Sequence, residues 1–313
     1  MSTDRAHTVF VTGTGLAVPG LSGAADLLGT APAEGGFDPE TGLTGRDLRH
    51  KDRATRLALR AVGPALEDAG LHDADDGFTA DPAATAVVVS SNTGNYDSVC
   101  GYVDTAALRG SRALSATGLP QTSTSGIVGW IAINYGLRGP TVGLGNGPAG
   151  GLDALHWGRN LIAVGRAGIA VVVGVEPHND VVARLLGTTA VDGAAAVVLE
   201  SAEHAARRGA RPRAVLRGYG RAPGLDGAVR RAAADGPDGA GLLLVDRLPD
   251  EPPGTGRVLD LQARLGHCSG ALGVLQCAAA TAWFDRGGRG PALATAEGTD
   301  ASVALLLAPP DAS

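Results

Sequence analysis

The residues best suited to chemistry in this sequence surround Pro148. Residues 139–144 form a short apolar run that predicts a strand, residues 145–151 are mostly glycine, and residues 150–164 have the apolar pattern of a helix. An α/β enzyme can present its nucleophile at such a junction, because the positive end of the helix lowers a thiol's pKa and stabilises an oxyanion. Proline suits the first position of a helix, but it offers neither a nucleophile nor an N–H donor. We therefore expect the helix start to be kept and the chemistry to be absent.

The same turn also matches a nucleotide-binding pattern. Gly145, Gly147 and Gly150 form a GxGxxG motif between a strand and a helix, and Glu176 ends the next strand. Glu176 lies farther along than the usual interval of about 20 residues, and Pro148 removes an N–H group that should bind a pyrophosphate. Dinucleotide binding is therefore the minor alternative, and no cofactor is expected.

His267 and Cys268 are the other candidates for chemistry. His267 is either a remnant of a catalytic base or an imidazole held by local hydrogen bonds. Cys268 is either a replacement nucleophile or a packed thiol, and Cys100 is interpreted as a core residue. The three cysteines lie far apart without a CxxC pair, so neither a disulfide framework nor a metal site is expected.

Composition limits the class of protein. The 313 residues are 44% hydrophobic and 19% charged, with a formal net charge of −6 and no basic cluster. One large globular unit or two fused, similar halves is expected, without a nucleic-acid partner. No apolar run approaches the roughly 20 residues that cross a bilayer, and the first residues are too polar for a signal peptide. A soluble, cytoplasmic protein with no membrane partner is the resulting expectation.

The expected elements alternate between strands and helices, which predicts stacked α/β layers. Strands are expected at residues 8–12, 84–90, 139–144, 168–175, 194–200, 211–219, 258–261 and 301–307. Helices are expected at residues 52–69, 125–135, 150–164, 201–208 and 269–284. Residues 222–254, rich in Gly, Ala, Asp and Pro, are interpreted as a loose stretch, and Trp130 and Trp157 as packing residues on apolar helices.

Several segments together resemble β-ketoacyl synthases of the thiolase superfamily, and most of all the chain-length-factor subunits of type II polyketide systems. The resemblance covers nearly the whole chain. The segments that carry it are Val9-Phe-Val-Thr-Gly-Thr-Gly15, residues 53–71, residues 122–140, residues 192–200, Leu265-Gly-His-Cys-Ser-Gly-Ala-Leu-Gly273 and Gly298-Thr-Asp-Ala-Ser302.

The resemblance places Pro148 at the position of the family's cysteine nucleophile. Residues 149–154 are similar to the chain-length-factor version, which has glutamine in place of that cysteine. Gln262 falls at the family's lysine, residues 294–296 at its phenylalanine–glycine gate, and no histidine between His204 and His267 matches its first catalytic histidine. The resemblance thus implies degenerate positions at Pro148, Gln262 and His267 and no catalytic residue.

The family fold implied is a thiolase-like, five-layer α-β-α-β-α arrangement of two fused halves. We expect residues 1–190 to form the first half, with the degenerate elbow, and residues 191–313 a truncated second half. The chain is shorter than a full ketosynthase, and the missing length lies between Glu176 and His267.

The implied function is that of a non-catalytic subunit. It would form a heterodimer with a cysteine-bearing ketosynthase alpha subunit, shape its acyl tunnel, and meet the acyl carrier protein only indirectly. The residues assigned to the elbow or tunnel are Gly147, Pro148, Ala149, His267, Cys268, Thr299 and Asp300. The residues assigned to the dimer interface are Thr122, Ser125, Gly139, Thr141, Val142, Gly143 and Leu144.

Two alternatives stay open. One is an enzyme of altered chemistry, a hydrolase or acyltransferase that acts on acyl-carrier thioesters through His267 and Cys268. The other is a homodimeric acyl-binding protein.

Overall fold

The computed structural model describes residues 8–29, 46, 51–73, 75–233, 239–248 and 256–310. In this part of the chain, ten strands join in one sheet with the order β10-β9-β11-β12-β8-β1-β7-β6-β4-β5. No helix in these ranges is long and apolar enough to cross a membrane.

The sheet consists of two sets of five strands with the same topology. The first set comprises β1 (Val9–Ala17), β4 (Thr85–Ser90), β5 (Thr141–Leu144), β6 (Ile169–Glu176) and β7 (Gly193–Ser201). The second comprises β8 (Ala214–Ala222), β9 (Leu242–Val245), β10 (Arg257–Asp260), β11 (Ala292–Glu297) and β12 (Ser302–Ala308). In both, the strands lie in the order third, second, fourth, fifth, first, and the fifth runs antiparallel to its two neighbours.

This repeated order confirms two fused, similar halves. The sets meet through β1 and β8, where Phe10 and Val11 pair with Val215 and Ala214. Strand pairing assigns β7 to the first set and β8 to the second, so along the chain the second set of strands begins at Ala214. The division of the chain at residues 190 and 191 stays a prediction.

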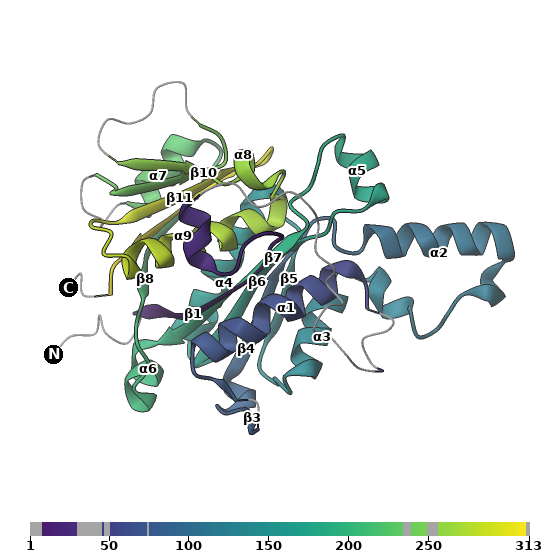
Figure 1. Ribbon diagram of the computed structural model, residues 1–313, viewed down its shortest axis with the longest axis horizontal. Coiled ribbons are helices and arrows are strands. Elements are labelled where there is room, and N and C mark those ends of the chain that lie inside the picture. The colour runs from purple at the N-terminus through teal and green to yellow at the C-terminus, as the bar shows by residue number, and fades with distance from the viewer. Residues whose placement is uncertain are drawn as a thin grey trace.

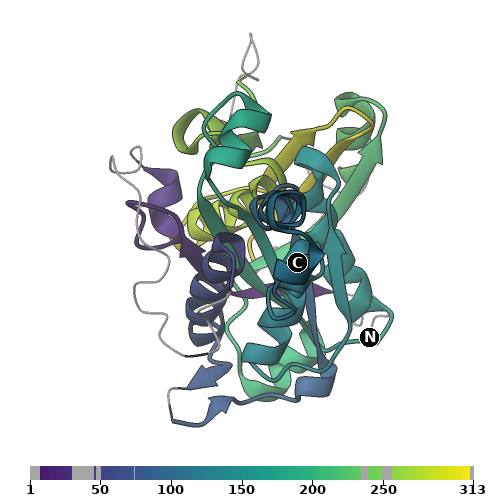
Figure 2. The same cartoon turned by 90° about the vertical axis from the view of Figure 1, so that its right-hand side faces the viewer.

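Helices separate and cover the sheets in five layers (Figures 1 and 2). On the outer face of the first set lie α1 (Arg53–Asp68) and α3 (Gly126–Asn134). Between the two sets lie α4 (Gly150–Ala163) and α9 (Leu272–Asp285), and α7 (Leu225–Ala232) covers the second set. The thiolase-like layering expected from the sequence is therefore confirmed.

The complete burial of some strands explains why the sequence predicts them. All eight residues of β6 and all six of β4 are buried, so these strands appear as uninterrupted apolar runs. Helix α9 is buried on nearly its whole surface because it packs between the two sets of strands. The largest hydrophobic cluster lies in this middle layer, around α4 and α9.

Several elements were not expected. Helix α7 and strand β9 lie in the stretch interpreted as loose, and β11 was not predicted. The buried residues of α7 are only Ala228 and Ala232, which give a weak periodic signal. Also unexpected are helices α5 (Asp180–Leu186) and α8 (Gln262–Leu265) and the pair of strands β2 (His72–Asp73) and β3 (Gly77–Phe78). Helix α6 (Ala202–Arg208) confirms the helix expected at residues 201–208.

Helix α2 (Tyr96–Arg109) projects away from the body of the molecule (Figure 1) and is seen nearly end-on in Figure 2. None of its residues is buried. The interpretation of Cys100 as a core residue is therefore wrong, because the thiol is only half-buried on this projecting helix. Trp157 is likewise not a packed residue, since 46% of it is exposed.

Candidate functional site

The elbow around Pro148 has the predicted geometry. Strand β5 ends at Leu144, a 3₁₀ turn covers Gly147–Ala149, and α4 begins at Gly150. Gly147 has a φ of 67°, a left-handed conformation that favours glycine. Pro148 lies inside this turn and is half-buried. Because an N–H at this position would have no partner within the helix, the proline costs no helical hydrogen bond.

The side-chain amide of Asn92 holds this elbow to the second half of the chain. Its Oδ1 accepts a hydrogen bond from the N–H of Gly147 at 2.9 Å, and its Nδ2 donates to the carbonyl of Gly147 at 2.9 Å. The same Nδ2 donates to the Ser269 hydroxyl at 2.7 Å. The turns that precede α4 and α9, the two helices of the middle layer, therefore meet at one amide.

Glu176 lies behind this amide and is 1% exposed. Its carboxylate accepts hydrogen bonds from the N–H groups of Asn92 (2.7 Å), Thr93 (3.0 Å) and Gly270 (3.0 Å), and from the Thr93 hydroxyl (2.5 Å). Burial raises the pKa of Glu176 despite these four donors. The carboxylate thus organises two loops from within the core.

This arrangement does not favour dinucleotide binding. The N–H of Gly147 already donates to Asn92, and Glu176 is enclosed rather than available to a ribose hydroxyl. A Cβ at Gly150 would also meet the Ser90 hydroxyl at 2.6 Å, so this glycine is needed for packing.

Cys268 is a packed thiol. It is fully buried, its Sγ donates to the carbonyl of Gly266 at 3.2 Å, and burial raises its pKa far above the ordinary value. Its N–H donates to Oε1 of Gln262 at 3.0 Å, while Nε2 of Gln262 donates to the carbonyl of Asp246. Gln262 therefore fixes the turn before Cys268.

His267 is held by its backbone. Its N–H donates to the carbonyl of Thr189 at 2.9 Å, and its carbonyl accepts from the N–H of Val191 at 3.1 Å. Burial lowers the pKa of the His267 imidazole, which favours the neutral form. Thr299 and Asp300 are exposed in the turn between β11 and β12. The role in an acyl tunnel that was assigned to these two residues, to His267 and Cys268, and to residues 147–149 stays a prediction.

The residues expected at a dimer interface lie at the free edge of the first set of strands. Among the residues that the structure describes, β5 is the last strand of the sheet. Thr141 and Gly143 are exposed, and Val142 and Leu144 are half-buried. Thr122 and Ser125 lie just before α3, which packs beside β5. Figure 1 shows β5, α3 and the base of α2 on the same side of the body.

Asn92 was not recognised from the sequence, and Glu176 was considered only for a nucleotide. The positions of both residues relative to the predicted strands could have indicated them. Asn92 lies two residues beyond the fully buried strand β4, and Glu176 ends the fully buried strand β6. The carboxyl ends of neighbouring parallel strands meet at one edge of a sheet.

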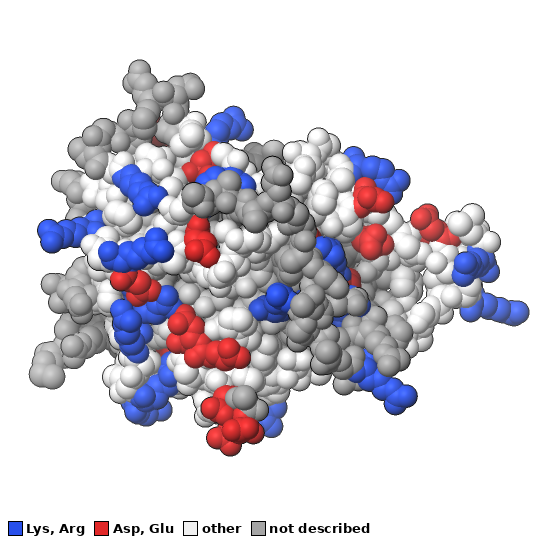
Figure 3. Space-filling model, in the orientation of Figure 1, with Lys and Arg blue, Asp and Glu red and all other residues white. Residues whose placement is uncertain are grey.

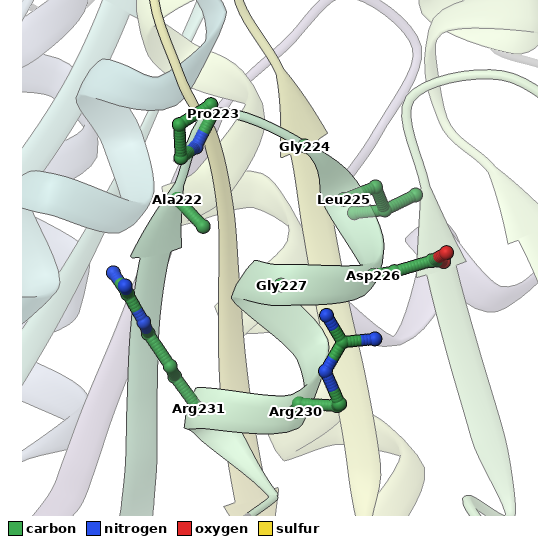
Figure 4. Close-up of a pocket in the computed structure, with 8 residues that line it drawn as sticks. All are labelled: Ala222, Pro223, Gly224, Leu225, Asp226, Gly227, Arg230 and Arg231. Carbon is green, nitrogen blue, oxygen red and sulfur yellow. The ribbon is translucent and has the colours of Figure 1, made fainter.

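One cavity, of about 600 Å³, lies elsewhere, at the start of α7. Figure 4 shows Arg230 and Arg231 on the helix beside it. It contains none of the predicted site residues. On the face of the molecule seen in Figure 3, basic and acidic side chains are interspersed.

Comparison with known proteins finds a family whose model matches the part of the chain that includes this elbow. The family model described as β-ketoacyl synthase, N-terminal domain, matches residues 20–189, which is more than half of the chain. A putative polyketide β-ketoacyl synthase 2 of Streptomyces virginiae is 34% identical over 155 residues, covering 50% of this chain and 37% of that protein. A 3-oxoacyl-[acyl-carrier-protein] synthase 2 of Vibrio cholerae is 27% identical, covering 67% of this chain and 55% of that protein. The chain thus spans roughly one third to just over one half of the length of these two relatives.

Solved structures share the fold. A type II polyketide synthase acyl-carrier protein in complex with its ketosynthase, bound to the hexaketide, gives a TM-score of 0.82 at 18% identity. The ishigamide ketosynthase/chain length factor gives a TM-score of 0.76 at 23% identity. Each comparison covers 96% of this chain and 99% of the other. The family model spans the strand–elbow–helix junction, and the solved structures share the thiolase-like layers. This chain belongs to the β-ketoacyl synthase family.

Proposed function

We propose that this chain is a catalytically inactive, chain-length-factor-type subunit that pairs with a cysteine-bearing ketosynthase in type II polyketide or polyene biosynthesis. The observation that carries the proposal is Pro148. The elbow, its glycine and the following helix are all in place, and the residue at its tip has no nucleophilic side chain.

The chemistry of condensation makes this loss decisive. The acyl chain must be held as a thioester on a nucleophile, and the enolate formed when the malonyl carboxylate leaves must be stabilised by paired imidazoles. Pro148 cannot form the thioester. His267 is the one histidine that matches the family's pair, so the loss affects members of a single catalytic unit.

The geometry gives little support to the hydrolase or acyltransferase alternative. A nucleophile needs a base within hydrogen-bond reach, whereas the Cys268 thiol donates to a backbone carbonyl. It is also fully buried, with a raised pKa, so the thiolate is strongly disfavoured.

The free edge at β5 supports pairing. An exposed edge strand has unpaired N–H and C=O groups that can add to another sheet. Two-fold interfaces of this kind are common among oligomers. The descriptions of the solved relatives name a ketosynthase with its acyl carrier protein and a ketosynthase/chain length factor. We infer a ketosynthase as the direct partner and an acyl carrier protein as an indirect one.

In that heterodimer the elbow residues and Thr299 and Asp300 would border the acyl tunnel, and Thr122, Ser125 and residues 139–144 would contact the partner. Homodimeric acyl binding remains the second candidate, since the same edge strand could pair with a second copy.

The test combines two measurements. The purified chain is incubated with an acyl-carrier thioester and its intact mass recorded, and we expect no acyl adduct. The chain is then co-expressed with its ketosynthase, and we expect co-elution and longer or more uniform products than the ketosynthase forms alone. A covalent adduct on this chain, or a ketosynthase that elutes apart and condenses equally well by itself, refutes the proposal.

A further inference from the structure

Two residues other than glycine have a positive φ among those that the structure describes, Asp192 at 48° and Ser269 at 42°. This left-handed conformation is unfavourable for a residue with a Cβ, so it persists only where contacts with the surrounding structure hold it. Arg53 of α1 donates two hydrogen bonds to the Asp192 carboxylate, each at 2.7 Å, and Asn92 donates one to the Ser269 hydroxyl. Side chains from distant parts of the chain therefore maintain both strained positions.

Asp192 closes the neck of a surface loop. The loop comprises residues 178–192, contains α5, and lies between β6 and β7. At its neck, the N–H of His178 donates to Oδ1 of Asp192 at 2.9 Å, and the N–H of Ala190 donates to Nδ1 of His178 at 3.4 Å. From residue 178 to residue 189, all of which the structure describes, only Val182 is buried. A loop with joined ends and few buried side chains can open while the core beneath it stays folded.

One seam joins this loop to the second half of the chain. The N–H of His267 donates to the carbonyl of Thr189 at 2.9 Å, and the N–H of Val191 donates to the carbonyl of His267 at 3.1 Å. These two backbone hydrogen bonds form a single parallel bridge between Ala190 and His267. The seam is therefore short enough to part as a unit.

The side chains at this seam are apolar. Val191, Leu265 and Cys268 are 5%, 7% and 0% exposed, and all three belong to the hydrophobic cluster of the middle layer. The next residue along the chain, Ser269, is joined to the elbow through the amide of Asn92. Parting of the seam would therefore uncover an apolar wall that adjoins the elbow, and such a wall suits a hydrocarbon chain rather than a charged ligand.

We propose that residues 178–192 form a lid that parts at this seam and admits an acyl chain to the space beside the elbow. The ion pair between Arg53 and Asp192 is the latch, because it holds the left-handed conformation of Asp192, and with it the neck of the loop, in the closed state. Release of Asp192 from this conformation favours opening. The identity of the ligand rests on the proposed function, whereas the opening is a property of the isolated chain.

Two buried cysteines report on the opening. The thiol of Cys268 is fully buried next to the seam, so iodoacetamide reaches it only when the lid has parted. Cys277 is fully buried in the middle of α9, so it reacts only when the fold as a whole unfolds. The alkylation of each cysteine is followed over several hours by peptide mass spectrometry, in a C100S background.

The variants R53Q and D192N each remove one charge of the latch, and asparagine tolerates the left-handed conformation. We expect each variant to raise the alkylation rate of Cys268 about tenfold or more and to leave that of Cys277 unchanged, because a charge-assisted pair of hydrogen bonds is lost at the neck alone. R207Q is the matched control. It breaks the exposed ion pair with Glu203 on α6 and should change neither rate.

Octanoyl-pantetheine serves as the acyl probe. In R53Q, whose lid is expected to open more often, the probe should slow the alkylation of Cys268 about threefold or more, because its hydrocarbon chain occupies the uncovered wall. Pantetheine without the acyl group should have no effect on this rate.

Each outcome decides one part of the proposal. Equal alkylation of Cys268 in R53Q, D192N and the parent overturns the lid. A parallel rise at Cys268 and Cys277 also overturns it, since it would assign Arg53 to global stability. Equal alkylation with and without octanoyl-pantetheine overturns the admission of an acyl chain. None of these measurements involves the ketosynthase, so a failure of the chain to pair with it refutes the proposed function alone.

Discussion

The backbone at Pro148 still has the geometry that activates a nucleophile in other proteins. Gly147 retains its left-handed conformation, Asn92 fixes both of its backbone polar groups, and α4 begins two residues after the proline. At the elbow itself, the missing feature is therefore a nucleophilic side chain rather than the arrangement of the main chain.

This distinction predicts the behaviour of P148C. A thiol at the start of α4 should have a lowered pKa and react with iodoacetamide at neutral pH. In a C100S background, intact mass should show one adduct for P148C and none for the parent, because Cys268 and Cys277 are fully buried and burial raises the pKa of Cys277 to about 12. P148C should still form no condensation product, since the second imidazole is absent. An unreactive thiol would show that the elbow is closed to reagents.

Glu200 makes the fold sensitive to acid. Burial raises its pKa, but hydrogen bonds from Arg208, Thr12 and His204 outweigh burial, and the pKa lies below its ordinary value of 4.5. A carboxylate with a depressed folded-state pKa contributes stability above its unfolded pKa and loses it as the pH falls through the folded value.

We therefore expect the free energy of unfolding of the wild type to fall as the pH decreases below about 4.5. E200Q should be less stable by about 2 kcal/mol at neutral pH, since it loses charge-assisted hydrogen bonds. E200Q should also lack the part of the pH dependence of its unfolding free energy that Glu200 contributes. Urea titrations from pH 7 to pH 3 measure both effects, and parallel pH profiles for the two proteins would contradict this assignment.

At the scale of elements, β5 is the strand on which the proposed pairing depends. Lysine on an edge strand opposes pairing with another sheet, because the charge must be desolvated. T141K should therefore abolish co-elution with the ketosynthase while changing the stability of the isolated chain by less than about 0.5 kcal/mol. A206K, an exposed position on α6, serves as the matched control and should leave pairing intact. Pairing by T141K at wild-type affinity would exclude β5 from the interface.

The two halves share a close contact between their first strand and the helix that follows it. A Cβ at Gly13 or Gly15 of β1 would overlap the carbonyl oxygens of α1, and one at Gly218 or Gly220 of β8 would overlap those of α7. The same Gly-x-Gly spacing thus occurs in the first strand of both halves, although the residues around it differ. These glycines allow the helix to pack closely on the strand.

The contact predicts opposite effects for two glycine-to-alanine substitutions. G15A should destabilise the fold by about 2 kcal/mol, because the new methyl group collides with the backbone of α1. G101A, where nothing lies within 4 Å of the new Cβ on α2, should stabilise the chain by about 0.5 kcal/mol. Urea denaturation of both variants measures the signs, and a neutral G15A would mean that α1 moves away without cost.

The sequence predicted those elements whose burial leaves a clear pattern. The buried strands β4 and β6 and the helices α1, α4 and α9 were found within a few residues of their ends. Helix α2 was missed because it has no buried face, and α7 because its buried face consists of alanines. At the site, the elbow was predicted, but Asn92 was not, because its contacts join loops that are far apart in the sequence.

At the scale of the whole molecule, the middle layer joins the two halves. Helices α4 and α9 come from different halves, yet they pack against each other so closely that a Cβ at Gly151 would meet the N–H of Gly273. Arg213 adds a polar connection, since it forms ion pairs with Asp68 of α1 and Asp285 of α9. Neither half can bury its side of this layer without the other.

This shared core predicts a single cooperative unfolding transition. Trp130 lies on α3 in the first half and Trp283 on α9 in the second, so each can report on one region by fluorescence once the other tryptophans are replaced by phenylalanine. In urea, the two single-tryptophan variants should unfold with the same normalised curve as the far-UV circular dichroism of each variant, because coincident probes mark two-state behaviour. If instead the Trp130 signal changed at a lower urea concentration than the helical signal, the outer layer of the first half would unfold independently. That result would contradict the single cooperative transition predicted here.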